Sequence, residues 1–233
     1  MRRSHPDVIE IGPRVPLPAP AAEVVRVLSP LVTEARLARM EAVVGQRTRS
    51  LVPVLEDLAD PHNGAAVLRS ADAFGCHEVH VIEGRHPFAV SHRVTRGTER
   101  WLELVRHGST DACLEHLTER GYQVFVAAMD GALSPEDLAQ VPKAAIVFGN
   151  EHRGASEAVR RAAAGTYAIP MVGFVESLNV SVASAVTLYV ASRGRHGDLV
   201  EDARMEIRAR FLLGQVKDAA RIVAERAPTT ESR

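Results

Sequence analysis

Three stretches of the chain share one layout, in which an apolar strand runs into a polar or glycine-containing turn and then into a helix. These stretches centre on Pro61–Gly75, Val147–Ser156 and Gly173–Tyr189. Strands and helices alternate along the chain, which predicts an α/β fold with a mostly parallel sheet and helices on both faces. Ligands of such sheets bind at the carboxyl ends of the strands, so we expect the three turns to form one site.

A continuous apolar segment, Ala144–Gly149, predicts a central strand, because parallel strands are buried on both faces. Shorter apolar or alternating segments predict further strands at Leu51–Leu55, Glu78–Glu83, Trp101–Val105, Gln123–Met129 and Tyr167–Met171. Helices are expected at Ala65–Phe74, Asp111–Arg120, Ser134–Gln140 and Ser156–Ala164, and from Asn179 onwards. Gly84–Gly97 is predicted to be a long polar loop.

The chain of 233 residues is long enough for one large α/β domain with short appendages. Residues 1–30 are rich in proline and predict an extended arm. Residues 31–197 are assigned to the α/β domain, which begins with a basic helix over 31–48. Residues 198–233 are expected to form a C-terminal helical extension, with one long amphipathic helix over Leu199–Arg226.

Composition and residue spacing argue against a membrane span, a secretory signal and a metal site. No apolar run approaches the ~18 residues of a membrane span, and the first residues lack the apolar segment of a secretory signal. Cys76 and Cys113 are isolated in sequence and suit a reducing cytoplasm, where we expect the protein. No histidine or cysteine spacing is typical of a metal site, so no metal is expected. The net charge of −1 gives no overall basic field, which counts mildly against a nucleic-acid partner.

Each of the three turns carries polar residues that suit a site. Asn63 and Arg69 lie near the start of the first helix. Placing the charge of an arginine in an apolar helical segment costs free energy unless a ligand or a partner group binds the guanidinium. The second turn, G-N-E-x-x-G at Gly149–Gly154, places backbone N–H groups and the Glu151 carboxylate at a strand end. In the third, Ser177 and Asn179 precede an apolar helix that we expect to be buried.

Simpler interpretations of these residues stay open. Arg69 also fits a surface position, Glu151 a helix-capping acid, and Asn179 a cap on a core helix. Two groups of arginines are candidates for contacts with RNA phosphates, although a solvated helix face explains them as well. They are Arg36 and Arg39 on the first helix, and Arg93, Arg96 and Arg100 further on. The chain contains neither a P-loop nor G-x-G-x-x-G, which argues against a nucleotide-binding oxidoreductase.

These motifs resemble those of a known family. P-H-N-x-x-A-x-x-R-x-A-D-A-x-G (Pro61–Gly75), G-x-E-x-x-G (Gly149–Gly154) and I-P-M-x-G-x-x-x-S-L-N-V-S-V-A (Ile169–Ala183) are similar to the three signature motifs of the SpoU/TrmH family. That family belongs to the SPOUT superfamily of S-adenosylmethionine-dependent RNA ribose 2′-O-methyltransferases. The resemblance covers roughly residues 31–195 and looks closest to the tRNA enzymes that act on a guanosine of the D-loop.

The resemblance implies a parallel sheet whose C-terminal part forms a deep trefoil knot, and a homodimer with its sites at the subunit interface. It implies that Arg69 is catalytic, together with Asn63, Glu151, Ser177 and Asn179. The methyl donor, S-adenosylmethionine, would lie near Ala127, Gly149, Ile169, Met171 and Leu178, with no metal required. The sequence therefore predicts RNA 2′-O-methylation, with tRNA as the expected substrate. Ribosomal RNA and a non-catalytic RNA-binding protein are the alternatives.

Overall fold

The structure, a computed structural model, describes residues 7–10, 15–84 and 88–226. The contacts within the chain define two compact units, and each is discontinuous in sequence. The first comprises Met1–Gly12 and Thr48–Arg195, and the second comprises Pro13–Arg47 and His196–Arg233. We describe each unit by itself.

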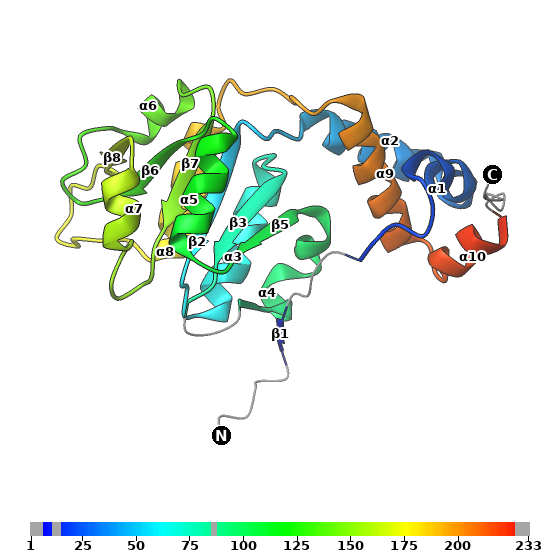
Figure 1. Ribbon diagram of the computed structural model, residues 1–233, viewed down its shortest axis with the longest axis horizontal. Coiled ribbons are helices and arrows are strands. Elements are labelled where there is room, and N and C mark those ends of the chain that lie inside the picture. The colour runs from blue at the N-terminus through cyan, green and yellow to red at the C-terminus, as the bar shows by residue number, and fades with distance from the viewer. Residues whose placement is uncertain (1–6, 11–14, 85–87, 227–233) are drawn as a thin grey trace. The chain divides into compact units, whose positions relative to one another are not determined.

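The first unit is built on a six-stranded sheet with the order β5-β3-β2-β7-β6-β8 (Figure 1). Every neighbouring pair in this sheet is parallel, so the predicted parallel sheet is confirmed. The strands span Leu51–Glu56 (β2), Glu78–Ile82 (β3), Glu103–His107 (β5), Gln123–Ala127 (β6), Ala144–Phe148 (β7) and Gly165–Tyr167 (β8). The apolar run that predicted a central strand is β7, which lies between β2 and β6 and is buried throughout.

Side chains alternate between two hydrophobic layers, as the period of a strand requires. In β2, Leu51 and Leu55 belong to one layer, whereas Val52 and Val54 belong to the other. The first layer includes residues of α3 and α8, and the second includes residues of α5 and α7 (Figure 1). These helices span Pro61–Ala73 (α3), Thr110–Glu119 (α5), Glu157–Ala162 (α7) and Val180–Ala191 (α8). Because the helices cover both faces, the free surface of the sheet is its edges, where loops gather.

The helix starts follow the usual capping rules. Ser109, Ser156 and Asn179 each accept a hydrogen bond from a backbone N–H in the first turn of α5, α7 and α8. The short helix expected at Ser134–Gln140 is α6, Pro135–Ala139, and Ser134 forms a capping box with Asp137. Local polar side chains therefore fix where each helix begins after its strand.

Five local predictions in this unit were wrong in whole or in part. The helix expected at Ala65–Phe74 begins at Pro61, because Asp60 caps it and accepts from the N–H of His62. Gly84–Gly97 is not a simple loop, because it contains β4 (Ala89–Ser91) and α4 (His92–Thr95), and residues 85–87 lie outside the described part. β4 pairs antiparallel with β1 (Val8–Glu10), which falls in the region predicted as an extended arm. The strand predicted at Tyr167–Met171 ends at Tyr167, shortly before Pro170, which has no N–H to donate to a neighbouring strand. The strand predicted at Trp101–Val105 is shifted, because Thr98–Trp101 forms a 3-10 turn (η2) before β5.

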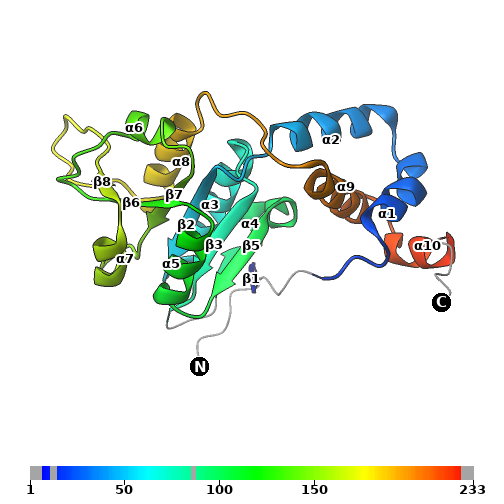
Figure 2. The ribbon, with the colours of Figure 1, turned by 45° about the horizontal axis from the view of Figure 1, so that its top comes forward.

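The second unit is helical, and its helices are α1 (Ala21–Leu28), α2 (Glu34–Gln46), α9 (Glu201–Gln215) and α10 (Ala219–Arg226), with a 3-10 turn (η1) at Ser29–Leu31. Figure 2 shows α9 beside α1, and buried Val24, Leu28 and Leu212 contribute to the core of this unit. Arg208 of α9 donates to the carboxylate of Glu41 in α2. The basic helix predicted over 31–48 is therefore present as α2, and its contacts group it with α9 and not with the sheet.

Two predictions for this unit were also wrong. The arm contains α1, because Pro20 occupies the position before the first helical residue and the following A-A-E-V-V-R-V-L buries one apolar side. The single long helix is two helices, because the chain becomes extended at Val216 and Asp218 has a left-handed backbone with a φ of 56°. No helix in the described residues is long and apolar enough to cross a membrane.

Candidate active site at the carboxyl edge of the sheet

A cavity of about 430 Å³ lies at the carboxyl ends of β6, β7 and β8. Its walls come from the segment after β6, the turn after β7 and the irregular segment before α8. All five residues predicted to bind a cofactor line it: Ala127, Gly149, Ile169, Met171 and Leu178. Glu151, Ser177 and Asn179 line it as well. Met129, Glu176, Val180 and Ala183, which the sequence analysis did not single out, also contribute to the lining.

The turn after β7 is held in shape by Asn150. Its side-chain amide donates to the backbone oxygen of Asp57 at 2.8 Å, and its oxygen accepts from the N–H groups of His152 and Arg153 at 3.0 and 3.2 Å. Asn150 also pairs with Gly154 through two backbone hydrogen bonds. A Cβ at Gly149 would overlap the backbone of Gly154 and Ala155, so this position requires glycine. These contacts fix the direction in which Glu151 leaves the strand.

Glu151 joins the second motif to the first. Its carboxylate accepts from the side-chain amide of buried Asn63 at 3.0 Å, and from the backbone N–H groups of Ala59 and Asp60 at 3.1 and 3.3 Å. Burial alone would raise the pKa of Glu151, but these hydrogen bonds and its own backbone N–H outweigh burial and lower the pKa. Glu151 is therefore ionised at neutral pH and is a poor proton acceptor.

The third motif contributes Asn179, the N-cap of α8, whose side-chain oxygen accepts from the N–H of Ser181 at 2.8 Å. We expected α8 to be buried, and this was wrong for one side of the helix. Ser184, Thr187 and Leu188 are buried, whereas Val182 and Tyr189 are about half exposed. The preceding Val172 and Phe174 are fully exposed. An apolar surface therefore continues from the cavity rim along α8.

A second hollow of about 470 Å³ lies beside the cavity, and it is lined by Ala59, Asp60, Pro61, Asn63, Glu151, His152 and Asn179. Glu151 and Asn179 line both hollows, so the polar motif residues form the border between them. No sequence pattern selected His152, because only the folded turn brings it to this wall. Most residues that line the cavity are apolar, whereas most that line the second hollow are polar. The two spaces therefore suit two different ligands, or two reactants of a single reaction.

Arg69 is not brought together with the other predicted catalytic residues in the described part of the chain. It is exposed on α3, lines neither hollow, and donates through Nη1 to the backbone oxygen of Val94 at 3.0 Å. The contact places Arg69 beside α4, and α3 packs against both α4 and η2. The exposed side chains of Arg93, Arg96 and Arg100 belong to this region. Arg36 and Arg39 are also exposed, but they lie on α2 in the other compact unit.

The parallel sheet with a ligand-sized cavity at its carboxyl edge defines an α/β protein whose site is built from three loops. Residues 50–189 match the model of the SpoU rRNA methylase family, and the chain belongs to that family. The match covers every strand of the large sheet and all three sequence motifs. The trefoil knot implied by the resemblance stays a prediction.

Relatives with assigned activities support this assignment. The chain is 37% identical over 164 residues to the tRNA (guanosine(18)-2′-O)-methyltransferase of Thermus thermophilus, covering 70% of this chain and 84% of the relative. It is 31% identical over 183 residues to the enzyme of the same name from Escherichia coli, covering 78% of each chain. Among solved structures it is similar to the TrmH/SpoU tRNA modifying enzyme of A. aeolicus, with 26% identity and a TM-score of 0.70 over 79% of this chain and 98% of that one.

Proposed function

We propose that this protein transfers a methyl group from S-adenosylmethionine to a ribose 2′-hydroxyl in RNA, and that its substrate is a D-loop guanosine of tRNA. The observation that carries the proposal is the cavity whose wall brings the second and third motifs together, with Glu151 bonded to Asn63 of the first. The guanosine assignment is supported by the names of the relatives that match most of the chain. With such a substrate, the protein is expected to act in the cytoplasm.

The cavity fits the methyl donor in size and lining. Its volume of about 430 Å³ lies in the range of small-ligand sites, and its walls combine apolar side chains with main-chain groups. Ile169, Met171 and Leu178 can cover a flat base, and the close-packed turn at Gly149 brings backbone groups to the ligand. The neighbouring hollow at Asn63, Glu151 and His152 then suits the ribose that accepts the methyl group.

The reaction requires the 2′-oxygen to be aligned behind the methyl group. When the donor is bound, its sulfonium would supply the methyl carbon, which bonds to the 2′-oxygen as the carbon–sulfur bond breaks. The neutral thioether S-adenosylhomocysteine is the leaving group, and the hydroxyl proton passes to solvent water. Asn63, Ser177 and Asn179 orient the two reactants from the walls of the two hollows, and alignment of this kind lowers the barrier substantially. Glu151 organises Asn63 and the backbone at Ala59 and Asp60.

Arg69 acts as an anchor for an RNA phosphate and stabilises the forming alkoxide. It does not serve as the proton acceptor, because an arginine in a protein stays protonated and a nearby phosphate reinforces its charge. Its position beside α4 groups it with Arg93, Arg96 and Arg100, which bind further phosphates. The α2 residues Arg36 and Arg39 bind RNA from the helical unit. Binding through these groups weakens steeply as salt rises.

The active unit is a homodimer. Val172, Phe174 and Tyr189 present an exposed apolar surface next to the cavity, which a second copy of the chain would cover. Arg69 does not line the cavity of its own chain. In a dimer, Arg69 of one copy could instead contribute to the cavity of the other copy. Mixing an Arg69→Ala chain with an Asn179→Ala chain tests this arrangement, because sites completed across the interface recover activity in mixed dimers and sites completed within one chain do not.

The decisive experiment is methyl transfer from labelled S-adenosylmethionine to unmodified tRNA and to rRNA, with Arg69→Ala beside the wild type. We expect 2′-O-methylguanosine in tRNA and a loss of at least about 100-fold in the variant. Arg161→Ala is the matched control, because Arg161 is also an exposed helical arginine and lines neither hollow. Label in rRNA alone would contradict the tRNA assignment, and retained donor binding without transfer to either RNA would indicate a non-catalytic binding protein.

A further inference from the structure

A cluster of metal-ligating side chains lies buried away from the methyl-transfer cavity. His80 comes from β3, His107 from the end of β5 and Cys113 from α5, and all three are buried. One nitrogen from each histidine and the sulfur of Cys113 lie within 4.8 Å of one another. His80 Nδ1 and His107 Nε2 are 3.0 Å apart, and the two rings are stacked with centroids 5.3 Å apart. None of the three lines the methyl-transfer cavity.

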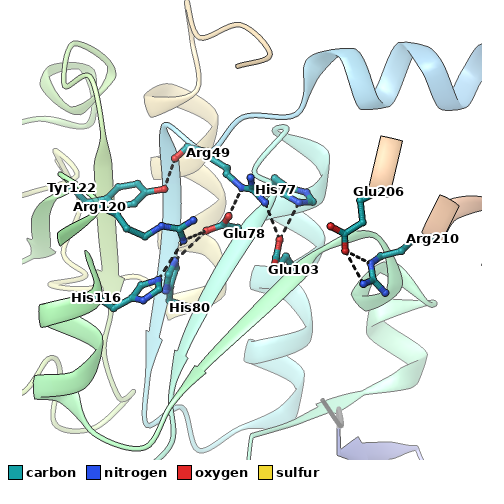
Figure 3. A network of polar contacts seen from close by, with 10 residues as sticks. All are labelled: Arg49, His77, Glu78, His80, Glu103, His116, Arg120, Tyr122, Glu206 and Arg210. Carbon is teal, nitrogen blue, oxygen red and sulfur yellow. Dashed lines mark hydrogen bonds and ion pairs between the residues drawn. The ribbon is translucent and has the colours of Figure 1, made fainter. Parts of the chain in front are cut away.

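The outer nitrogen of His80 is oriented by a carboxylate. His80 Nε2 lies 3.7 Å from Glu78 Oε2 and has no closer hydrogen-bond partner among the described residues, while Arg49 and Arg120 hold Glu78 in place (Figure 3). A carboxylate facing the outer nitrogen of a histidine is the usual support for a metal ligand, because it fixes the ring tautomer and leaves the other nitrogen unprotonated. In this tautomer His80 Nδ1 would carry a lone pair on the side that faces His107 Nε2.

We propose that His80, His107 and Cys113 bind one zinc ion. Two imidazoles and a thiolate form a donor set that zinc prefers, and one further ligand would complete the tetrahedron. Ligand atoms in a tetrahedral zinc site lie about 3.3–3.8 Å apart, so small side-chain rotations bring this cluster to that geometry. Binding releases the thiol proton of Cys113, because the thiolate is the ligand. The ion would fasten α5 to β3 and β5, and it takes no part in methyl transfer.

The protonation states fit this inference. Burial and the neighbouring His80 and His116 lower the pKa of His107 to about 4, so its ring is neutral at physiological pH. Burial and the nearby Glu56 raise the pKa of Cys113 to about 12, so without a cation the thiol keeps its proton. A divalent cation offsets the effect on Cys113, because it stabilises the thiolate, and the neutral ring of His107 can bind the cation without losing a proton.

The test is the metal content of tag-free protein purified from cells grown with added zinc, measured by mass spectrometry. We expect about one zinc per chain, reduced at least tenfold in Cys113→Ser and in His107→Gln. Cys76→Ser is the matched control, because Cys76 is the other buried cysteine and belongs to the opposite hydrophobic layer, and this variant should keep its zinc. Zinc-free wild-type protein, or equal loss in the Cys76 and Cys113 variants, would overturn the proposal.

A cobalt-substituted protein provides a readout that does not depend on folding yield. Growth with added cobalt should give the visible bands of a tetrahedral site and a thiolate-to-cobalt absorption, and Cys113→Ser should remove the thiolate band. Circular dichroism identifies variants that fold, so loss of metal from an unfolded chain is not counted. A cobalt protein whose spectrum shows no thiolate ligand would contradict the assignment even if metal is present.

Discussion

Two glutamates at opposite edges of the same sheet have lowered pKa values for different reasons. Glu78 begins β3 at the amino edge, is 1% exposed, and pairs with Arg49 and Arg120 (Figure 3). Burial alone would raise the pKa of Glu78, but His80 and the two arginines outweigh it. Glu151 follows β7 at the carboxyl edge, is only partly buried, and accepts hydrogen bonds from neutral N–H groups.

The different causes of the two lowered pKa values indicate different roles. Glu78 stabilises the fold, and we assign Glu151 to a ligand site. At Glu78 two half-buried arginines compensate a buried negative charge, so removing an arginine would leave that charge with less compensation. At Glu151 neutral donors fix the geometry and leave the negative charge on the wall of two hollows. We therefore assign stability to the amino edge of the sheet and function to the carboxyl edge, where open parallel sheets bind their ligands.

The largest expected effect is on the stability contributed by Glu78. Glu78→Gln should lower the free energy of unfolding by about 3 kcal/mol, because Arg49 and Arg120 lose their buried counterion. Chemical denaturation measures this loss, and methyl transfer per folded molecule should stay near wild type. Glu103→Gln is the control, since Glu103 also pairs with Arg49 but is 31% exposed, and it should cost less than about 1 kcal/mol. Equal losses of unfolding free energy in the two variants would contradict the claim that burial makes Glu78 more important for stability than Glu103.

The reverse pattern is expected at Glu151. Glu151→Ala should lower kcat/KM by about 30-fold, or about 2 kcal/mol of transition-state stabilisation, because Asn63 and the backbone at Asp60 lose their common acceptor. Its unfolding free energy should change by about 1 kcal/mol or less. Steady-state kinetics and thermal unfolding on one preparation make the comparison. Glu136→Ala, an exposed glutamate of α6, should change neither quantity, and a Glu151 variant that unfolds without losing activity would reverse the assignment.

The sequence predicted the parts of this molecule that depend on local order along the chain. Alternation of strands and helices is enough to require parallel strands, and parallel strands bring their following turns to one edge. For this reason the residues selected near Gly149, Ile169 and Leu178 all line one cavity. The cap at Asn179 was predictable because its side chain bonds only two residues along the chain.

Features that depend on contacts between distant segments could not be predicted in this way. Asn63 and Arg69 were both predicted to belong to the catalytic site, yet six residues of helix separate them by about 9 Å along the axis. Arg69 donates to the backbone oxygen of Val94 instead. Helix α1 was missed because a proline-rich composition also fits a chain in which Pro20 precedes a helix. His80, His107 and Cys113 come from three elements, so no spacing in the sequence indicates their cluster.

A smaller effect separates two asparagines of the site, Asn150 and Asn63. Asn150→Ala should weaken the binding of S-adenosylmethionine about tenfold, because the turn that walls the cavity loses three hydrogen bonds. Asn63→Ala should leave donor affinity within about twofold and reduce turnover, because Asn63 lines only the neighbouring hollow. Calorimetric titration of the donor into each variant checks both values. Equal weakening by both substitutions would show that the two hollows act as one binding site.

The smallest expected effect is the pH dependence of stability that Glu151 contributes. Its folded-state pKa lies below the ordinary value of 4.5, so as the pH falls the unfolded chain takes up this proton first. The contribution is therefore complete above about pH 4.5 and is lost as the pH falls through the lower folded-state pKa, and partial exposure limits it to about 1 kcal/mol or less. Unfolding free energies of the wild type and Glu151→Gln between about pH 7 and 3.5 measure it. Their difference should be constant down to about pH 4.5 and should shrink below it. A difference that grows on acidification would mean that Glu151 is stabilised in its protonated form, and the site would then hold a proton donor where we assign a fixed negative charge.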